Sequence, residues 1–135
     1  MASGSNPTHI LNKLAAEALA AHRLVIIDPS DADYVRYPEA DYDTQLFGIT
    51  AEAADSGDQV DIIIGGIAML QVDGNVANIA WGDWIAAHDV IGYGRKVALS
   101  DGTTYREVIG KAFQAATADG AIIPVHIAPN VFQTA

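Results

Sequence analysis

Cysteine is absent from this chain of 135 residues, which excludes disulfide bonds, zinc–thiolate sites and cysteine nucleophiles. Basic residues are scarce: seven Lys and Arg stand against 17 Asp and Glu, for a formal net charge of −10. A protein that binds nucleic acid or an anionic membrane surface needs a cationic face, because phosphate neutralisation supplies most of the non-specific affinity. We therefore expect no nucleic-acid partner and no membrane partner.

Long hydrophobic runs are also missing, since the longest one, Ile62–Leu70, is about half the length that crosses a bilayer. The first residues, MASGSNPTH, lack the basic start and apolar centre of a signal peptide. Hydrophobic residues make up 50% of the chain and charged residues 18%, a balance typical of one globular domain. We expect a soluble, non-secreted protein.

Groups that could carry catalysis are scattered along the chain. The serines lie in the leader or in turn-like stretches, and no Gly-x-Ser-x-Gly motif is present. The histidines stand singly, with no pair at metal-ligand spacing; they are His9, His22, His88 and His126. His126 alternates with Val125 and Ile127, so we expect it to face solvent or an interface. These observations predict no enzyme, no catalytic residue, no cofactor and no metal site.

Acidic residues cluster in one stretch, opposed only by Arg36. They are Asp28, Asp31, Asp33, Glu39, Asp41 and Asp43. Three of them, Asp28, Asp31 and Asp33, carry the hard oxygens that Ca²⁺ prefers, but their spacing does not fit an EF-hand loop. Asp is also a common turn residue. The stretch is interpreted as a solvated acidic loop.

Turn residues recur about every eight to twelve residues from Leu24 onward, a spacing typical of a β-sandwich or barrel. Asp73–Gly74 separates two apolar-rich runs and predicts a hairpin between them. The fold class predicted is all-β, a small sandwich-like or barrel-like domain. Four turn glycines are expected to adopt positive φ; they are Gly57, Gly74, Gly102 and Gly120.

The N-terminal stretch, residues 1–22, has a different pattern. Leu11, Leu14, Ala15 and Ala18 would share one face of a helix, and Asn6–Pro7 would suit its start. A short helix and an extended arm are both open for this segment. The division expected is therefore an arm or helix over residues 1–22 and a β-rich domain over residues 23–135.

One pattern occurs twice, first from Phe47 to Leu70 and again over residues 109–127. The matching positions are Gly48 with Gly110, Ala53–Ala54 with Ala115–Ala116, Gly57 with Gly120, and Val60, Ile62 and Ile64 with Ile123, Val125 and Ile127. No catalytic residue is shared between the two copies. We interpret the repeat as a strand–turn–strand building unit.

Two features suggest contacts with other subunits. Ile62–Leu70 and Leu24–Ile27 are apolar at both strand parities, so both strand faces need cover, and a sister subunit could supply it. Trp81 and Trp84 are three residues apart and would face opposite sides of a regular strand unless Gly82 marks a bulge. One tryptophan is then expected in the core and the other exposed as an interface anchor, and the alternative is that both belong to the core.

The order of these elements resembles the small capsid cement (decoration) proteins of tailed bacteriophages. The resemblance covers residues 23 to 129 and depends on glycine and apolar spacing. The matching steps are Gly48, Gly57, Gly66–Ala68, Gly82–Asp83–Trp84–Ile85 and Ile109–Gly110–Lys111–Ala112. The acidic loop between Pro29 and Tyr42 is longer than that family's pattern.

The resemblance implies a non-enzymatic structural protein of the virion, made in the host cytoplasm. It would bind the major capsid protein on the outer surface of the phage head, stabilise contacts between capsid subunits, and associate with itself as a homotrimer. The residues expected at the oligomer or capsid interface are Ile10, Leu11, Leu14, Leu19, Ile63, Met69, Trp81 and Trp84. The alternatives are a β-sandwich module that binds a ligand such as carbohydrate, with an exposed tryptophan as platform, and an all-β hydrolase that uses the acidic loop.

Overall fold

The computed structural model describes residues 4–97 and 105–133, and every regular element in those ranges is a strand. The strands are β1 (Asn6–Ala15), β2 (Leu24–Asp28), β3 (Asp31–Arg36), β4 (Leu46–Thr50), β5 (Gln59–Asp73), β6 (Trp84–Ala87), β7 (Gly94–Lys96), β8 (Tyr105–Ala112) and β9 (Asp119–Gln133). The all-β prediction is confirmed. A search of these residues for a helix able to cross a membrane found no candidate.

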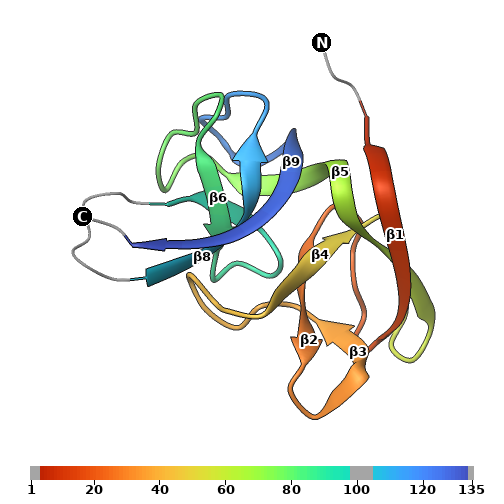
Figure 1. Cartoon of the computed structure of the whole chain (residues 1–135). Coiled ribbons are helices and arrows are strands. Elements are labelled where there is room, and N and C mark those ends of the chain that lie inside the picture. Colours follow the sequence, from red (N-terminus) through yellow and green to blue (C-terminus); the bar gives the residue numbers. More distant parts are fainter. Residues whose placement is uncertain (1–3, 98–104, 134–135) are drawn as a thin grey trace.

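The nine strands form a single sheet that curls on itself twice through β5. Its order is β1-β3-β2-β4-β5-β7-β6-β8-β9, and β5 also pairs with β1 and with β9. The additional pairings close two rings: β1, β3, β2, β4 and β5 form the first ring, and β5, β7, β6, β8 and β9 form the second. Figure 1 shows β5 running between the two groups of strands. The barrel-like expectation therefore describes each half.

β5 is apolar at both strand parities because it belongs to both rings, and each of its faces packs against residues of the same chain. Ile62 belongs to the buried cluster of the first ring, with Val25 and Val35. Its neighbour Ile63 is only 3% exposed and belongs to the main cluster, which includes side chains of β6, β8 and β9. Each face of β5 is thus covered at this point by a different ring of the same chain. These two residues therefore need no cover from a sister subunit, contrary to the expectation that one could supply it.

The helix considered for the N-terminal segment is absent, because Asn6–Ala15 forms β1. This strand pairs with β5 from Asn6↔Ile67 to Leu14↔Gln59 and reaches β3 only at its end, through Leu14 and Ala15. An isolated helix of this length is marginal in water, whereas the open edge of β5 offers backbone partners along the segment. The extended alternative had the right conformation, but the strand is hydrogen-bonded into the sheet.

The sequence repeat corresponds to a structural repeat that extends further than the matched residues. The bridge Leu19↔Ala54 in the first half has its equivalent in Ile79↔Ala116 in the second. The pairs Val25↔Gly48 and Ile85↔Gly110 are likewise equivalent. Each ring therefore contains the same arrangement of strands. Gly48, one of the glycines common to both copies, allows neighbouring strands to approach closely, because a Cβ on Gly48 would lie 2.5 Å from the Ile63 carbonyl oxygen.

The turn glycines divide into two kinds. Gly57 and Gly120 adopt φ of 87° and 83°, as predicted. Gly74 does not have positive φ, and the predicted Asp73–Gly74 hairpin is wrong: the end of β5 pairs with β7 and β9, and the next run bridges to Ala116. Glycine is required at position 74 because the backbone there lies close to Ala116: a Cβ added to Gly74 would lie 2.5 Å from the Ala116 carbonyl oxygen. Gly102 lies outside the described residues.

Candidate functional site

Neighbouring strands of the second ring place a row of large side chains on its outer surface. Ile67 on β5 pairs with His126 on β9, which pairs with Lys111 on β8, which pairs with Trp84 on β6. Directly opposed residues of antiparallel strands project from the same face of a sheet. His126 and Lys111 are exposed, whereas Ile67 and Trp84 are half-buried. The row therefore crosses the sheet as a partly exposed band.

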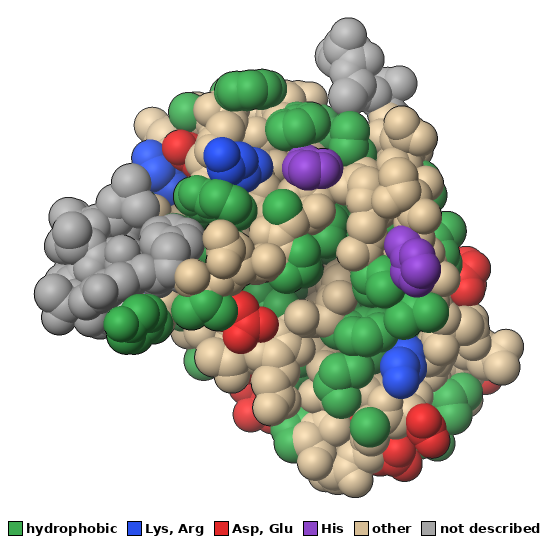
Figure 2. All heavy atoms as spheres, viewed as in Figure 1, with side chains coloured by type: hydrophobic (Ala, Val, Ile, Leu, Met, Phe, Trp, Pro, Cys, Tyr) green, Lys and Arg blue, Asp and Glu red, His purple; other side chains and the backbone are tan. Residues whose placement is uncertain are grey.

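The band widens on both sides into a surface that we call the aromatic face. Its members are Ile67, Met69, Trp81, Trp84, Lys111, Phe113, Ile122, Pro124 and His126, of which Pro124 is buried. In Figure 2, hydrophobic side chains gather with Lys or Arg and a His in the upper part of the view, over β9. None of the nine is Asp or Glu, although the chain has 17 of these residues. The face thus differs in charge from the acidic chain that carries it.

Three rings of the aromatic face are stacked. The Trp81 and Phe113 ring centroids are 5.8 Å apart with an interplanar angle of 15°, and those of Phe113 and His126 are 5.5 Å apart at 19°. Trp81 nevertheless remains 71% exposed. Beside the stack, the Lys111 Nζ lies 4.8 Å from the centroid of the Trp84 ring, within range of a cation–π interaction.

Backbone hydrogen bonds fix the segments that carry the stack. The Phe113 N–H donates to the Pro124 carbonyl at 2.9 Å, which places Phe113 beside β9. The Gly82 N–H donates to the Ala112 carbonyl at 2.7 Å, and Gly82 has φ of 88°, a conformation that glycine adopts without strain. The chain therefore turns directly after Trp81, so that Trp81 and Trp84 do not follow one regular strand.

The predicted interface residues fall into three groups. Met69, Trp81 and Trp84 lie on the aromatic face, where Trp81 is exposed and Trp84 is half-buried against Ala86, Val97 and Val108. The three predicted β1 residues lie elsewhere: Ile10 and Leu11 are 48% and 39% exposed, and Leu14 is half-buried. The last group is Leu19 and Ile63.

Leu19 and Ile63, also expected at the interface, do not lie on the surface of the single chain. They are 4% and 3% exposed in the single chain, because Leu19 packs in the first ring and Ile63 in the main cluster. Sequence reasoning also missed Lys111, Phe113 and Ile122. The alternation of Lys111 and Phe113 around Ala112 indicated an outward face of a strand, but only the pairing of β8 with β9 brings Phe113 beside His126. The expectation that His126 faces outward is confirmed.

A second cluster of ionisable groups surrounds His88, whose side chain is 8% exposed. The His88 Nδ1 lies 2.8 Å from Asp41 Oδ1 and 3.2 Å from Asp89 Oδ1, and its Nε2 lies 3.1 Å from Asp73 Oδ2. Asp41 Oδ2 also accepts an ion pair from Arg95 Nη1 at 3.2 Å. These contacts join the segment around Asp41 to the end of β5 and to β7.

Two of the carboxyl groups around His88, those of Asp41 and Asp73, have a lowered pKa, which favours their charged form. Burial raises the pKa of Asp41, but hydrogen bonds from the His88 ring and the Asp89 N–H, together with the Arg95 charge, outweigh it and lower the pKa. Burial likewise raises the pKa of Asp73, and N–H donors of Asn75 and Val76 with the His88 ring lower it on balance. Asp41, His88 and Asp89 present ligand atoms within 4.8 Å of one another, and the His88 ring contacts both carboxylates directly. We interpret the cluster as a structural clamp.

The acidic stretch is therefore more ordered than a solvated loop. Asp28 Oδ1 accepts from the Ser30 N–H at 2.9 Å and Asp31 Oδ1 from the Asp33 N–H at 3.0 Å, as turn-forming Asp residues do. Asp41 is engaged by His88, as described above. Turn hydrogen bonds and the contact with His88 therefore engage these three carboxylates.

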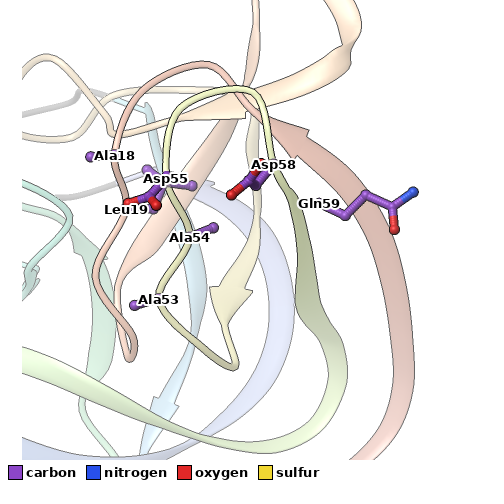
Figure 3. A pocket seen from close by; sticks show the side chains of 7 residues that line it. All are labelled: Ala18, Leu19, Ala53, Ala54, Asp55, Asp58 and Gln59. Atoms are coloured by element: carbon purple, nitrogen blue, oxygen red, sulfur yellow. The ribbon is translucent and has the colours of Figure 1, made fainter.

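Two hollows of the described surface have linings that share no residue with the aromatic face. One lies between residues 18–19 and the turn before β5, and Figure 3 shows the side chains that line it. They are Ala18, Leu19, Ala53, Ala54, Asp55, Asp58 and Gln59. The other is lined by Ala16, Glu17, Asp28 and Arg36. Neither lining includes a histidine, a hydroxyl nucleophile or an aromatic ring.

Comparison with solved structures gives a similar fold in the head fiber gp8.5 N base in bacteriophage phi29. The TM-score is 0.64 at 20% sequence identity, and the match covers 89% of this chain and 93% of that one. At this identity the similarity shows the fold alone. Comparison with curated proteins gave no match. The sequence does match the family described as phage cement protein, over residues 5–127. This chain therefore belongs to the phage cement protein family, with the capsid-associated, structural and non-enzymatic role that the family implies in the virion.

Proposed function

We propose that this protein binds the outer surface of a phage head and stabilises contacts between subunits of the major capsid protein. Membership of the cement protein family supports a capsid-associated role. The single observation that carries the finer proposal is the aromatic face, with Trp81 71% exposed on it. Large aromatic side chains at the surface of a soluble domain are the groups that most often dominate binding energy at protein interfaces.

We also propose that the protein associates with itself, as a homotrimer made in the host cytoplasm before it joins the head. The argument from apolar strand parity no longer supports this at Leu24, Val25 or Ile63, which are buried within the single chain. The support that remains is on β1, where Ile10 and Leu11 are 48% and 39% exposed. The segment 1–22 is thus proposed as a second contact region, beside a capsid-binding body over residues 23–135.

A carbohydrate-binding module would place its exposed tryptophan on the floor of a groove, because sugars are held by concave sites with converging polar groups. The two hollows described above have no aromatic ring in their linings. Trp81 also has one side occupied by Phe113 in the stack. This geometry favours contact with a broad protein surface over a sugar site.

The proposal is tested by adding the purified protein to phage heads that lack it. We expect saturable co-sedimentation with the heads, together with a higher temperature of head disruption once the sites are filled. The control is the same protein added to heads that already carry their full complement. Absence of binding at micromolar concentration, with the added protein folded, would contradict the proposed function.

A further inference from the structure

The two rings provide an internal comparison for the aromatic face. The row Leu24↔Ile49↔Ile63 in the first ring is paired in the same way as Trp84↔Lys111↔His126 in the second. The two rows occupy equivalent places on equivalent strands. They differ in what lies over them.

The first-ring row is buried by the second ring. Leu24, Ile49 and Ile63 are 0%, 0% and 3% exposed, and they belong to one cluster with residues of β6, β8 and β9. The outer surface of the first ring is therefore already used as a contact surface, within the chain itself. At the equivalent surface of the second ring, Lys111 and His126 are exposed, although Phe113 stacks on the His126 ring.

The aromatic stack is not needed to build the ring. The first ring has Ala21 where the second has Trp81, and Ala51 where the second has Phe113. The hydrogen bonds are the same at both places: His22 N–H to the Thr50 carbonyl matches Gly82 N–H to the Ala112 carbonyl, and Ala51 N–H to the Asp61 carbonyl matches Phe113 N–H to the Pro124 carbonyl. Since alanine suffices for the fold, the large rings have another use.

We propose that the aromatic face is the surface that docks on the capsid, and that its occupant is a segment of a capsid subunit that presents an apolar side chain next to a carboxylate. The apolar side chain would lie against Trp81 and Ile122, and the carboxylate would meet Lys111. This inference depends on the proposed function and specifies the site and the partner's chemistry.

Charge determines the choice of occupant. The face has no carboxylate among its nine members and carries Lys111, on a chain of net charge −10. A second copy docked as the second ring docks on the first would bring apolar side chains over Lys111, and an unpaired buried ammonium group is strongly unfavourable. Two copies also repel each other at long range, because each has the same large negative charge. A segment that offers its own carboxylate avoids the unpaired charge.

The first test is removal of the stack. Trp81→Ala and Phe113→Ala should each weaken binding to undecorated heads about tenfold or more, because exposed aromatic side chains at interfaces are frequent hot spots. Tyr105→Ala is the matched control, since Tyr105 is 69% exposed at the far end of β8 and lies outside the face. Melting temperatures of all three variants are measured in the absence of heads, to show that each is folded.

The second test is reversal of the charge. Lys111→Glu should abolish most of the binding to heads, and the binding that remains should be little more sensitive to salt. Lys111→Arg keeps the positive charge and should retain binding. Stronger binding by Lys111→Glu would show that the partner presents a cation and would overturn the inference. Light scattering on Trp81→Ala distinguishes a capsid segment from a second copy as the occupant of the face. If this variant loses self-association while its binding to heads is unchanged, the face binds a second copy and the inference is wrong.

These outcomes separate the inference from the function on which it depends. If the unaltered protein binds heads and Trp81→Ala and Phe113→Ala bind equally well, the face is not the docking surface, although the cement function stands. If Tyr105→Ala weakens binding as much as Trp81→Ala does, the loss is not specific to the face and the inference is wrong. If the unaltered protein does not bind heads, both proposals are wrong.

Discussion

At the scale of single residues, glycine serves two separate needs in this fold. Gly57 and Gly120 occupy turns with positive φ, and a Cβ on Gly57 would meet nothing within 4 Å. Gly74 does not have positive φ, but a Cβ there would lie 2.5 Å from the Ala116 carbonyl oxygen and 2.6 Å from its carbon. The first need concerns backbone angles and the second concerns space, so the two positions respond differently to the same substitution.

Asparagine distinguishes the two needs, because it tolerates positive φ better than other non-glycine residues but still has a Cβ. We expect Gly57→Asn to lower the melting temperature by only about 2 °C, while Gly74→Asn and Gly74→Ala each lower it by about 5 °C or more. Thermal unfolding followed by circular dichroism measures this. A mild effect of both Gly74 substitutions would show that the backbone there moves apart at little cost.

The His88 clamp predicts a dependence on pH. The pKa values of Asp41 and Asp73 are lowered in the folded protein from their ordinary value of 3.8, so their stabilising contribution is present above that value. It is lost as the pH falls through the lowered folded-state pKa values, because both carboxyl groups must then be protonated. We expect the melting temperature to fall steeply below about pH 4.

Asp73→Asn provides the comparison for this pH dependence, since the amide oxygen can still accept from the Asn75 N–H but does not titrate. The variant should be less stable than the unaltered protein near neutral pH and should lose less stability on acidification. Melting temperatures at a series of pH values measure both effects. Equal slopes for the two proteins would mean that Asp73 does not contribute to acid unfolding.

At the scale of elements, β1 has both a structural and a surface role. Its pairing with β5 covers one edge of the shared strand, and its end reaches β3 to close the first ring. Ala15 at that end is fully buried with Val60 and Ile62, while Ile10 and Leu11 remain largely exposed. The strand therefore contributes to the core at its C-terminal end and to the surface along the rest.

Deletion of residues 1–15 should accordingly lower the melting temperature by about 5 °C or more, because β5 loses its partner and the first-ring cluster loses cover. Ile10→Thr is the matched control, since threonine suits a strand and Ile10 is 48% exposed. It should leave the melting temperature within about 2 °C of the unaltered value. A truncated protein that melts like the full chain would show that β1 is an independent arm.

At the scale of the whole molecule, charge and apolar surface oppose each other. A net charge of −10 on 135 residues favours separation of the copies, whereas the exposed apolar side chains of β1 and of the aromatic face favour association. Such repulsion is screened by salt, with a Debye length of about 8 Å at physiological ionic strength. Self-association should therefore respond to salt in the opposite sense from contacts that depend on attraction between unlike charges.

We expect the proposed trimer to be favoured as ionic strength rises from about 0.01 M to about 0.15 M, where screening becomes short-ranged. Light scattering after size-exclusion chromatography measures the mass at each salt concentration. The Lys111→Glu variant, whose net charge is more negative by two, should need more salt to reach the same mass. A trimer that dissociates as salt is added would show that ion pairs between copies hold it together.

The sequence by itself determined the fold class and the building unit of this protein, since turn spacing, alternating β-branched residues and the repeat of Gly48 and Gly110 are local patterns. It also predicted the outward position of His126 and the positive φ of Gly57 and Gly120. These properties depend on backbone angles and strand parity, which neighbouring residues fix on their own.

Only the tertiary structure decided which apolar residues are covered. Ile63 and Trp84 both looked like interface residues, and the parity of a strand shows two faces without showing what packs on each. Closure of two rings on β5 buries Ile63 under the second ring and leaves the equivalent His126 exposed beside Phe113. Strand pairing joins residues distant in sequence, so the physical cause of the aromatic face is long-range and no local pattern contains it.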